Sequence, residues 1–171
     1  MNSDGVLDAM QGLILEHGQP PSIQAIAKQL GRSKQAVLHY FPDRVALETA
    51  LAQRAITRVD EAMTAAAARG DAAATYLRLA LPTTEDRAVA LLVLASLRTK
   101  ESLLDGVDAA IERWEGLIAA ELGSHVAAEA VRLVGDGLFV QSLVGEPPAA
   151  ERVEALIAYL LGHDERTQPR R

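Results

Sequence analysis

Cysteine is absent from the 171-residue sequence, and so is any hydrophobic run long enough to cross a membrane. The uncharged run AVALLVLASL (88–97) has about half of the roughly 20 apolar residues that a membrane-spanning helix needs. The first residues, MNSDGVLDAM, lack the basic start and the apolar core of a secretory signal peptide. Without cysteine, nothing points to an oxidising compartment. We therefore expect a soluble, cytoplasmic protein.

Motifs that carry catalysis or bind metal are also missing from the sequence. The four histidines, His17, His39, His125 and His163, have no second histidine, cysteine or acidic residue at metal-site spacing. No glycine-rich phosphate loop, nucleophile elbow or paired-carboxylate motif is present. We predict no metal, no cofactor and no enzymatic activity. A hydrophobic content of 49% excludes a disordered chain.

The charge of the sequence is unevenly distributed. The net charge is −6, which by itself argues against a nucleic-acid partner. However, residues 1–58 hold six basic and five acidic residues, whereas residues 59–171 hold eleven and eighteen. Between residues 18 and 42 there is no acidic residue, although Lys28, Arg32 and Lys34 lie there. An anionic partner would therefore meet a locally basic segment.

Alanine and leucine dominate the sequence, no β-type alternation is sustained, and glycine or proline separates the apolar segments. This pattern predicts an all-α fold with about nine helices. Candidate helix N-caps are Ser22, Ser33, Asp71, Thr83 and Ser124, and candidate left-handed C-terminal stops are Gly31, Gly70 and Gly123.

One predicted helix, over residues 43–68, is much longer than its neighbours. Its apolar residues recur at three- and four-residue spacing and form one stripe: Leu47, Leu51, Ala55, Val59, Ala62 and Ala66. Such a helix would be roughly 35 to 40 Å long, which suits a connection between a small N-terminal domain and a larger C-terminal one.

Two short segments precede this long helix, on either side of Gly31. Residues 22–30 place Ile23, Ile26 and Leu30 on one face, and the second segment turns Val37 and Phe41 inward. Two short helices joined by a tight turn that contains glycine are typical of the helix-turn-helix, whose second helix enters the DNA major groove.

The run IAKQLGRSKQAVLHYFPDRVAL (26–47) resembles the N-terminal DNA-binding domain of TetR-type transcriptional repressors. The shared features are the Ile-Ala pair, the Gly-x-Ser turn, and an aromatic pair that leads to Phe-Pro, Arg44 and Leu47. The preceding segment VLDAMQGLILEHG (6–18) is similar to the first helix of that family. The resemblance covers about the first third of the chain.

The resemblance implies a homodimer that binds a palindromic operator as a ligand-responsive repressor. Residues 1–46 would form the DNA-binding domain, residues 47–162 the helical ligand-binding and dimerisation domain, and residues 163–171 a flexible tail. The third helix would span residues 33–40, and the N-terminal amides of the fourth helix would face a phosphate. The residues expected to contact DNA are Ser22, Lys28, Arg32, Ser33, Lys34, Gln35, Ala36, His39, Tyr40 and Arg44.

Two features of the sequence depart from the family pattern. Leu38 stands where the family usually has a tyrosine that contacts the DNA backbone, and residues 1–18 lack the usual basic residues and carry Asp4, Asp8 and Glu16. We therefore expect DNA binding that is weaker and more sensitive to salt than is usual for the family. The alternative is a helical bundle that binds a small molecule or a protein, with DNA binding weakened or lost.

The last two long segments, residues 124–145 and 148–162, carry apolar stripes that are too rich for packing on one side. Some of these residues must lie in the core of the subunit. We predict that the two helices also pair with their symmetry mates, through an interface of Val131, Val134, Gly135, Leu138, Ser142, Val153, Leu156, Ile157 and Leu160.

Trp114, the single tryptophan, marks either a core position or a ligand pocket. Because aromatic residues make up only 4% of the chain, a pocket here would be mostly aliphatic and would take an apolar effector. The predicted pocket residues share its helical face or could face it: Tyr76, Leu77, Leu91, Leu103, Val107, Ile111, Trp114 and Ile118.

Overall fold

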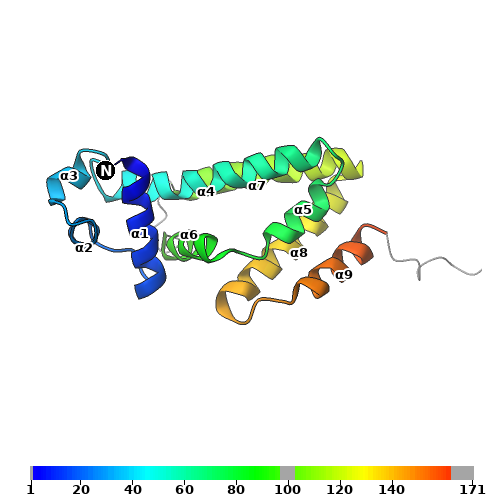
Figure 1. Ribbon diagram of the computed structural model, residues 1–171. Helices are drawn as coiled ribbons and strands as arrows, with labels where there is room; N and C mark the ends of the chain where they lie inside the picture. Colours follow the sequence, from blue (N-terminus) through cyan, green and yellow to red (C-terminus); the bar gives the residue numbers. More distant parts are fainter. Residues whose placement is uncertain (1, 97–102, 163–171) are drawn as a thin grey trace, which may run out of the picture. The chain divides into compact units, whose positions relative to one another are not determined.

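A computed structural model of the protein describes residues 2–96 and 103–162, and these residues form helices joined by turns and short loops, with no strand among them (Figure 1). The all-α prediction is confirmed. The predicted tail, residues 163–171, lies outside the described residues. The helices are α1 (Ser3–His17), α2 (Ile23–Gln29), α3 (Lys34–Leu38), α4 (Arg44–Ala67), α5 (Ala72–Leu79), α6 (Thr84–Ser96), α7 (Leu103–Leu122), α8 (His125–Val144) and α9 (Ala150–Leu160).

Most of the predicted helix starts have the expected capping bonds. The hydroxyl of Ser22 accepts a hydrogen bond from the amide of Ala25 at 3.1 Å, and Ser33 and Ser124 cap their helices in the same way. Thr83 accepts from the amide of Asp86 at 3.2 Å. These bonds satisfy amides that have no partner within the helix. They fix where α2, α3, α6 and α8 begin.

Asp71 occupies the N-cap position of α5, as predicted, but its side chain does not make the expected capping bond. Its carboxylate accepts instead from the hydroxyl of Thr75 at 3.2 Å. Glu121, which is remote in sequence, binds the first amides of α5 by accepting from Ala72 and, at 3.4 Å, from Ala73. A carboxylate near a helix N-terminus also interacts favourably with the helix dipole, so Glu121 replaces the expected local cap.

Contacts between residues divide the chain into two compact units. The first contains residues 1–58 and 83–109, and the second contains residues 59–82 and 110–171. α4 and α7 each run through a boundary between the units. The functional division predicted between residues 46 and 47 stays a prediction.

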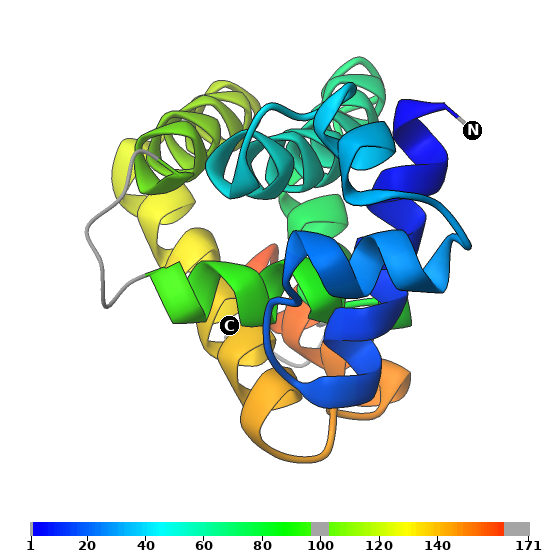
Figure 2. The ribbon, with the colours of Figure 1, turned by 90° about the vertical axis from the view of Figure 1, so that its left-hand side faces the viewer.

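In the first unit, α1 packs against both α2 and α6, and α2 packs against α3 (Figures 1 and 2). α6 comes after α4 and α5 in the sequence but packs against α1 in space. The buried core includes Met10, Ile14 and Ile26, together with Leu47 and Leu51 from the predicted stripe of α4. Burying each large aliphatic side chain stabilises the fold by about 1.5 to 3 kcal/mol.

In the second unit, α5 packs against α8 and α9. Its core includes Met63, Leu77, Ile118 and Val131. No helix in the described ranges is both long and apolar enough to span a bilayer. Nor do His, Asp or Glu side chains in those ranges form a group that could hold a metal ion.

Candidate nucleic-acid interface

The turn between α2 and α3 has the geometry that the glycine predicted. Gly31 has a φ angle of 61°, in the left-handed region that residues with a Cβ atom rarely adopt. Its amide donates to the carbonyl of Lys28 at 3.1 Å, and the amide of Arg32 donates to the carbonyl of Ala27 at 2.9 Å. This pair of bonds is the Schellman motif, which closes the end of a helix. The chain can therefore turn sharply, and α3 begins at Lys34 with Ser33 as its N-cap.

The inner face of α3 joins the core of the first unit. Val37 is fully buried, and Phe41, just past the helix, is 8% exposed. They lie in the same cluster as Ile26 and Ala27 of α2. The predicted inward positions of the helix-turn-helix are therefore confirmed, and this packing holds two helices that are too short to be stable alone.

The opposite face of α3 carries polar side chains in solvent. Ala36 is half-buried, and the rings of His39 and Tyr40 meet edge to face with their centroids 5.3 Å apart. Donors and acceptors on such a face match the edges of bases and the oxygens of phosphates. The other residues expected to contact DNA are all exposed: Ser22, Lys28, Arg32, Ser33, Lys34, Gln35, His39, Tyr40 and Arg44.

The basic residues around the turn keep their charge available. Lys28, Arg32 and Lys34 are exposed, and none of them forms an ion pair within the described part of the chain. Because no acidic residue lies between residues 18 and 42, this segment presents uncompensated positive charge.

The start of α4 is less open to a phosphate than expected. The carboxylate of Asp43 accepts from the amide of Ala46 at 2.8 Å, so one of the N-terminal amides already has an anionic partner. Arg44 donates through Nε to Glu48 at 2.5 Å, and Glu48 is only 7% exposed. Spacings of three and four residues in a helix would have signalled both contacts. The contribution of Arg44 to DNA contact stays a prediction.

The predicted ligand-pocket residues are divided between the two compact units. Leu91 and Val107 belong to the first unit, and the side chain of Leu103 lies outside the described residues. The remaining residues belong to the second unit, where two are fully buried and Ile111 is half-buried; they are Tyr76, Leu77, Ile111, Trp114 and Ile118.

Trp114 is only half-buried, and its indole Nε1 donates to Asp60 at 2.6 Å. Its ring centroid lies 6.5 Å from that of Tyr76. A polar partner for the indole is what a tryptophan needs when it lies at the edge of a core. Asp60 also accepts from Arg113 at 2.7 Å, so one carboxylate of α4 holds two side chains of α7.

Tyr76 is the centre of a second polar network in this unit. Its hydroxyl donates to Asp136 at 2.8 Å, and burial together with the nearby negative charge of Asp136 raises the pKa of Tyr76 far above its usual range. Arg132 donates to both Glu115, at 2.6 Å, and Asp136, at 2.9 Å. The phenol therefore stays protonated and fixes α5 against α8.

Gly135 is required by the position of Tyr76. A Cβ atom built at Gly135 would lie 2.6 Å from Cε1 of the Tyr76 ring, closer than two carbon atoms can approach. The sequence places Gly135 in the predicted dimer interface. In the structure a side chain of the same chain fills this space.

The residues predicted for the dimer interface lie mostly inside the subunit. Val134, Leu156 and Leu160 are half-buried. The other six are buried: Val131, Gly135, Leu138, Ser142, Val153 and Ile157. The structure thus places much of this set in the intramolecular core, which the sequence had left as an alternative.

A different apolar stripe of α8 faces solvent. Val126 is 77% exposed, Leu133 57%, Val140 51% and Val144 79%. Their spacings of seven, seven and four residues put them on one helical face, opposite the buried face. Sequence reasoning missed this stripe, although the same spacing could have revealed it.

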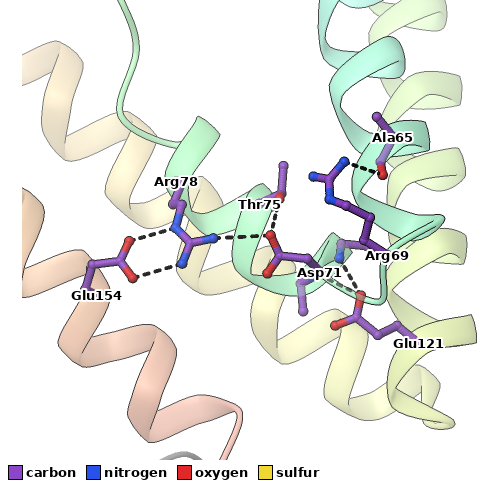
Figure 3. Close-up of polar contacts among 9 residues, drawn as sticks. Ala65, Arg69, Asp71, Thr75, Arg78, Glu121 and Glu154 are labelled. Atoms are coloured by element: carbon purple, nitrogen blue, oxygen red, sulfur yellow. Dashed lines mark hydrogen bonds and ion pairs between the residues drawn. The ribbon is translucent and has the colours of Figure 1, made fainter.

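Each unit has a cavity among the described residues. The cavity of the second unit has a volume of about 460 Å³ and lies beside α5, α7 and α9. Arg78 donates there to both carboxylate oxygens of Glu154, at 2.7 and 2.9 Å (Figure 3). Arg78 also contacts Asp71 at 3.4 Å. None of the predicted pocket residues lines either cavity.

Comparison with known protein families gives one match. The model described as the tetracyclin repressor-like, C-terminal domain matches residues 70–164, which is more than half of the chain. No curated protein and no solved structure matches the chain significantly.

Proposed function

This chain belongs to the TetR family of regulators, and we propose that it is a DNA-binding transcriptional repressor that acts as a homodimer on a palindromic operator. The family match covers the C-terminal part of the chain, whereas the surface that would contact DNA lies in the first unit. The proposal therefore rests on two separate parts of the molecule.

The polar face of α3 is the single observation that carries DNA binding. Lys34, Gln35 and His39 are exposed on α3 or at its C-terminal end, while Val37 anchors the helix from the other side. An exposed helix with a buried anchor can enter the major groove without unfolding. Lys28 and Arg32, beside it, supply charge for phosphates.

The exposed stripe of α8, defined by Val126, Leu133, Val140 and Val144, supports a homodimer. Gly137 lies on the same face, and a Cβ atom there would meet nothing within 4 Å, so the backbone of a second helix has room to approach. A helix that is apolar on two opposite faces needs a second partner to bury the outer one. A second copy of α8 offers the matching surface in a two-fold dimer.

A repressor of this type needs an effector that changes its affinity for DNA. We place this control on α4, because the helix begins next to the helix-turn-helix and continues into the second unit. An effector acts only through a difference in its affinity for the DNA-bound and free conformations.

The test begins with selection of palindromic duplexes by the full-length protein, followed by fluorescence-anisotropy titration against a scrambled duplex. The variant Lys34→Ala/Gln35→Ala/His39→Ala should lose sequence preference and at least a hundredfold in affinity, because each good base contact contributes about 1 to 3 kcal/mol.

A matched control removes the same kinds of side chain at exposed positions outside α3. Arg69→Ala/Gln53→Ala/His125→Ala should bind the selected duplex like the wild type. If the wild type prefers no selected duplex over the scrambled one at low salt, the DNA-binding proposal is wrong. The alternative, a helical ligand-binding bundle with DNA binding lost, would then hold.

A further inference from the structure

The cavity of the first unit lies among α1, α4 and α6 and has a volume of about 530 Å³. Pockets for small organic ligands typically have roughly 300 to 1,000 Å³. It is formed within one compact unit. A ligand there would contact both the first helix of the DNA-binding region and the long helix α4.

One side of this cavity is apolar. Leu15 of α1, Leu51 and Ala55 of α4 and Val89 of α6 line it. Gly12 also lines it, and a Cβ atom at Gly12 would meet nothing within 4 Å. Three helices therefore leave open space against an aliphatic wall, which suits a short hydrocarbon chain.

The other side carries two guanidinium groups one helical turn apart. Arg54 donates to Asp8 and to Gln11 of α1, each at 2.6 Å. Arg58, four residues later on the same face of α4, pairs with Asp86 of α6. Both arginines line the cavity, as do Asp8 and Gln11, so its polar side holds two guanidinium groups that are each paired with a carboxylate.

The contact between Arg54 and Asp8 can be exchanged at low cost. The side chain of Asp8 is 68% exposed, whereas that of Arg54 is 33% exposed. An ion pair with one partner so open to water contributes at most about 1 kcal/mol. A released Asp8 would remain hydrated, while a carboxylate that enters the cavity could take its place on the guanidinium fork.

From this arrangement we propose that the cavity binds a small amphipathic carboxylate, such as a medium-chain fatty acid. Arg54 binds its carboxylate in place of Asp8, Arg58 adds positive charge, and the hydrocarbon chain lies against Leu15, Leu51 and Val89. An uncharged apolar molecule would leave the guanidinium contacts unused. An organic cation would find Asp8 already bound to Arg54 and would be repelled by the guanidinium groups of both arginines.

The ligand would act on α1. Arg54 holds α1 to α4 through Asp8 and Gln11, and α1 packs against α2 of the helix-turn-helix. Replacing those contacts would loosen the support of α2 and α3. This consequence rests on the proposed DNA-binding function, whereas ligand binding itself does not.

Isothermal titration calorimetry of the full-length protein with sodium octanoate tests the site. Octanoate should bind with one site per subunit, and 1-octanol and octyltrimethylammonium should bind at least tenfold more weakly. No heat of octanoate binding, or equal affinity for octanoate and octanol, would overturn the proposal.

Two variants and their matched controls locate the binding. Arg54→Gln should weaken octanoate binding at least tenfold, while Arg69→Gln, an exposed arginine of the second unit, should leave it unchanged. Gly12→Leu should block the cavity without loss of stability, because leucine is a better helix former than glycine. Gly116→Leu, at an equally open helix position, should bind octanoate like the wild type.

Unchanged octanoate binding in Gly12→Leu would place the ligand elsewhere and refute the site, even if Arg54→Gln failed to fold. In the DNA titration, octanoate should weaken wild-type binding and leave Gly12→Leu unaffected. If the protein binds no DNA but calorimetry gives the expected pattern, the site stands and the proposed repressor function fails.

Discussion

The outward faces of α3 and α8 differ in chemistry. Around α3, the solvent meets Lys34, Gln35 and His39, with more charge from neighbouring residues. Along α8, it meets Leu133 and Val140 at intervals of seven residues. Each helix has an apolar inner face that is buried in its own unit. The outer faces are therefore not needed for the fold and indicate different partners, one anionic and one apolar.

The basic residues around the turn of the helix-turn-helix differ from six arginines elsewhere in the chain. These six arginines, from both units, are each paired with at least one carboxylate: Arg44, Arg54, Arg58, Arg78, Arg113 and Arg132. In contrast, Lys28 and Lys34 form no ion pair among the residues that the structure describes. An unpaired cation can bind a phosphate without first giving up a partner. The helix-turn-helix is thus the better electrostatic match for DNA, despite the acidic chain.

The largest effect is expected from a charge on the apolar face of α8. Val140→Asp should raise the dimer dissociation constant by roughly a thousandfold, since the two-fold axis places two unpaired carboxylates in the interface, at a cost of several kcal/mol. Analytical ultracentrifugation over a range of concentrations measures this change.

Val45→Asp provides the control, because Val45 on α4 is 49% exposed and Val140 is 51% exposed. It should leave the dissociation constant unchanged. A wild type that sediments as a monomer of 18.3 kDa at micromolar concentration would show that the apolar face serves another purpose.

The next effect is on binding to DNA. Replacing the three unpaired cations around the turn, Lys28, Arg32 and Lys34, should lower the affinity for the selected duplex by roughly a hundredfold or more. It should also reduce the slope of log affinity against log salt concentration by about 2 to 3, because fewer counterions are released. Anisotropy titrations at several salt concentrations measure both quantities for the variant Lys28→Gln/Arg32→Gln/Lys34→Gln.

A control with the same change in net charge separates local from overall electrostatics. This control is Arg69→Gln/Arg87→Gln/Arg152→Gln, whose three arginines lie outside α2 and α3. The variant should retain the wild-type salt slope. Equal losses in both variants would mean that only total charge matters, and the unpaired cations around the turn would have no special role.

Local features of this fold were predictable from sequence because neighbouring residues decide them. Ser22 and Ser33 cap helices through amides three residues away, and Gly31 supplies the left-handed turn between them. Val37 and Phe41 could be assigned to the interior because a short helix has one face to bury. The helix-turn-helix was therefore recognisable as a unit.

Long-range contacts could not be predicted in the same way. α8 carries two apolar stripes with helical spacing, and nothing local says that Val131 lies inside while Leu133 lies outside. The contact of Arg54 with Asp8 joins residues 46 positions apart, and the cap of α5 by Glu121 joins residues about 50 apart. Such choices depend on how helices pack, which one sequence does not specify.

The smallest effect concerns the inner face of α8, where Gly135 meets Tyr76. Gly135→Ala should lower the free energy of unfolding by about 1 to 3 kcal/mol, because the added methyl group would displace the Tyr76 ring from its place beside Asp136. Gly116→Ala, in open space on α7, should raise it by up to about 1 kcal/mol through helix propensity alone. Urea denaturation measures both, at one fixed protein concentration because the proposed dimerisation would make stability depend on concentration. If Gly135→Ala lowers and Gly116→Ala raises the free energy of unfolding, the inner face of α8 is closely packed within the subunit. If both substitutions raise it, the Tyr76 ring moves aside for the added methyl group, and the packing of the inner face is as adaptable as that of the outer face.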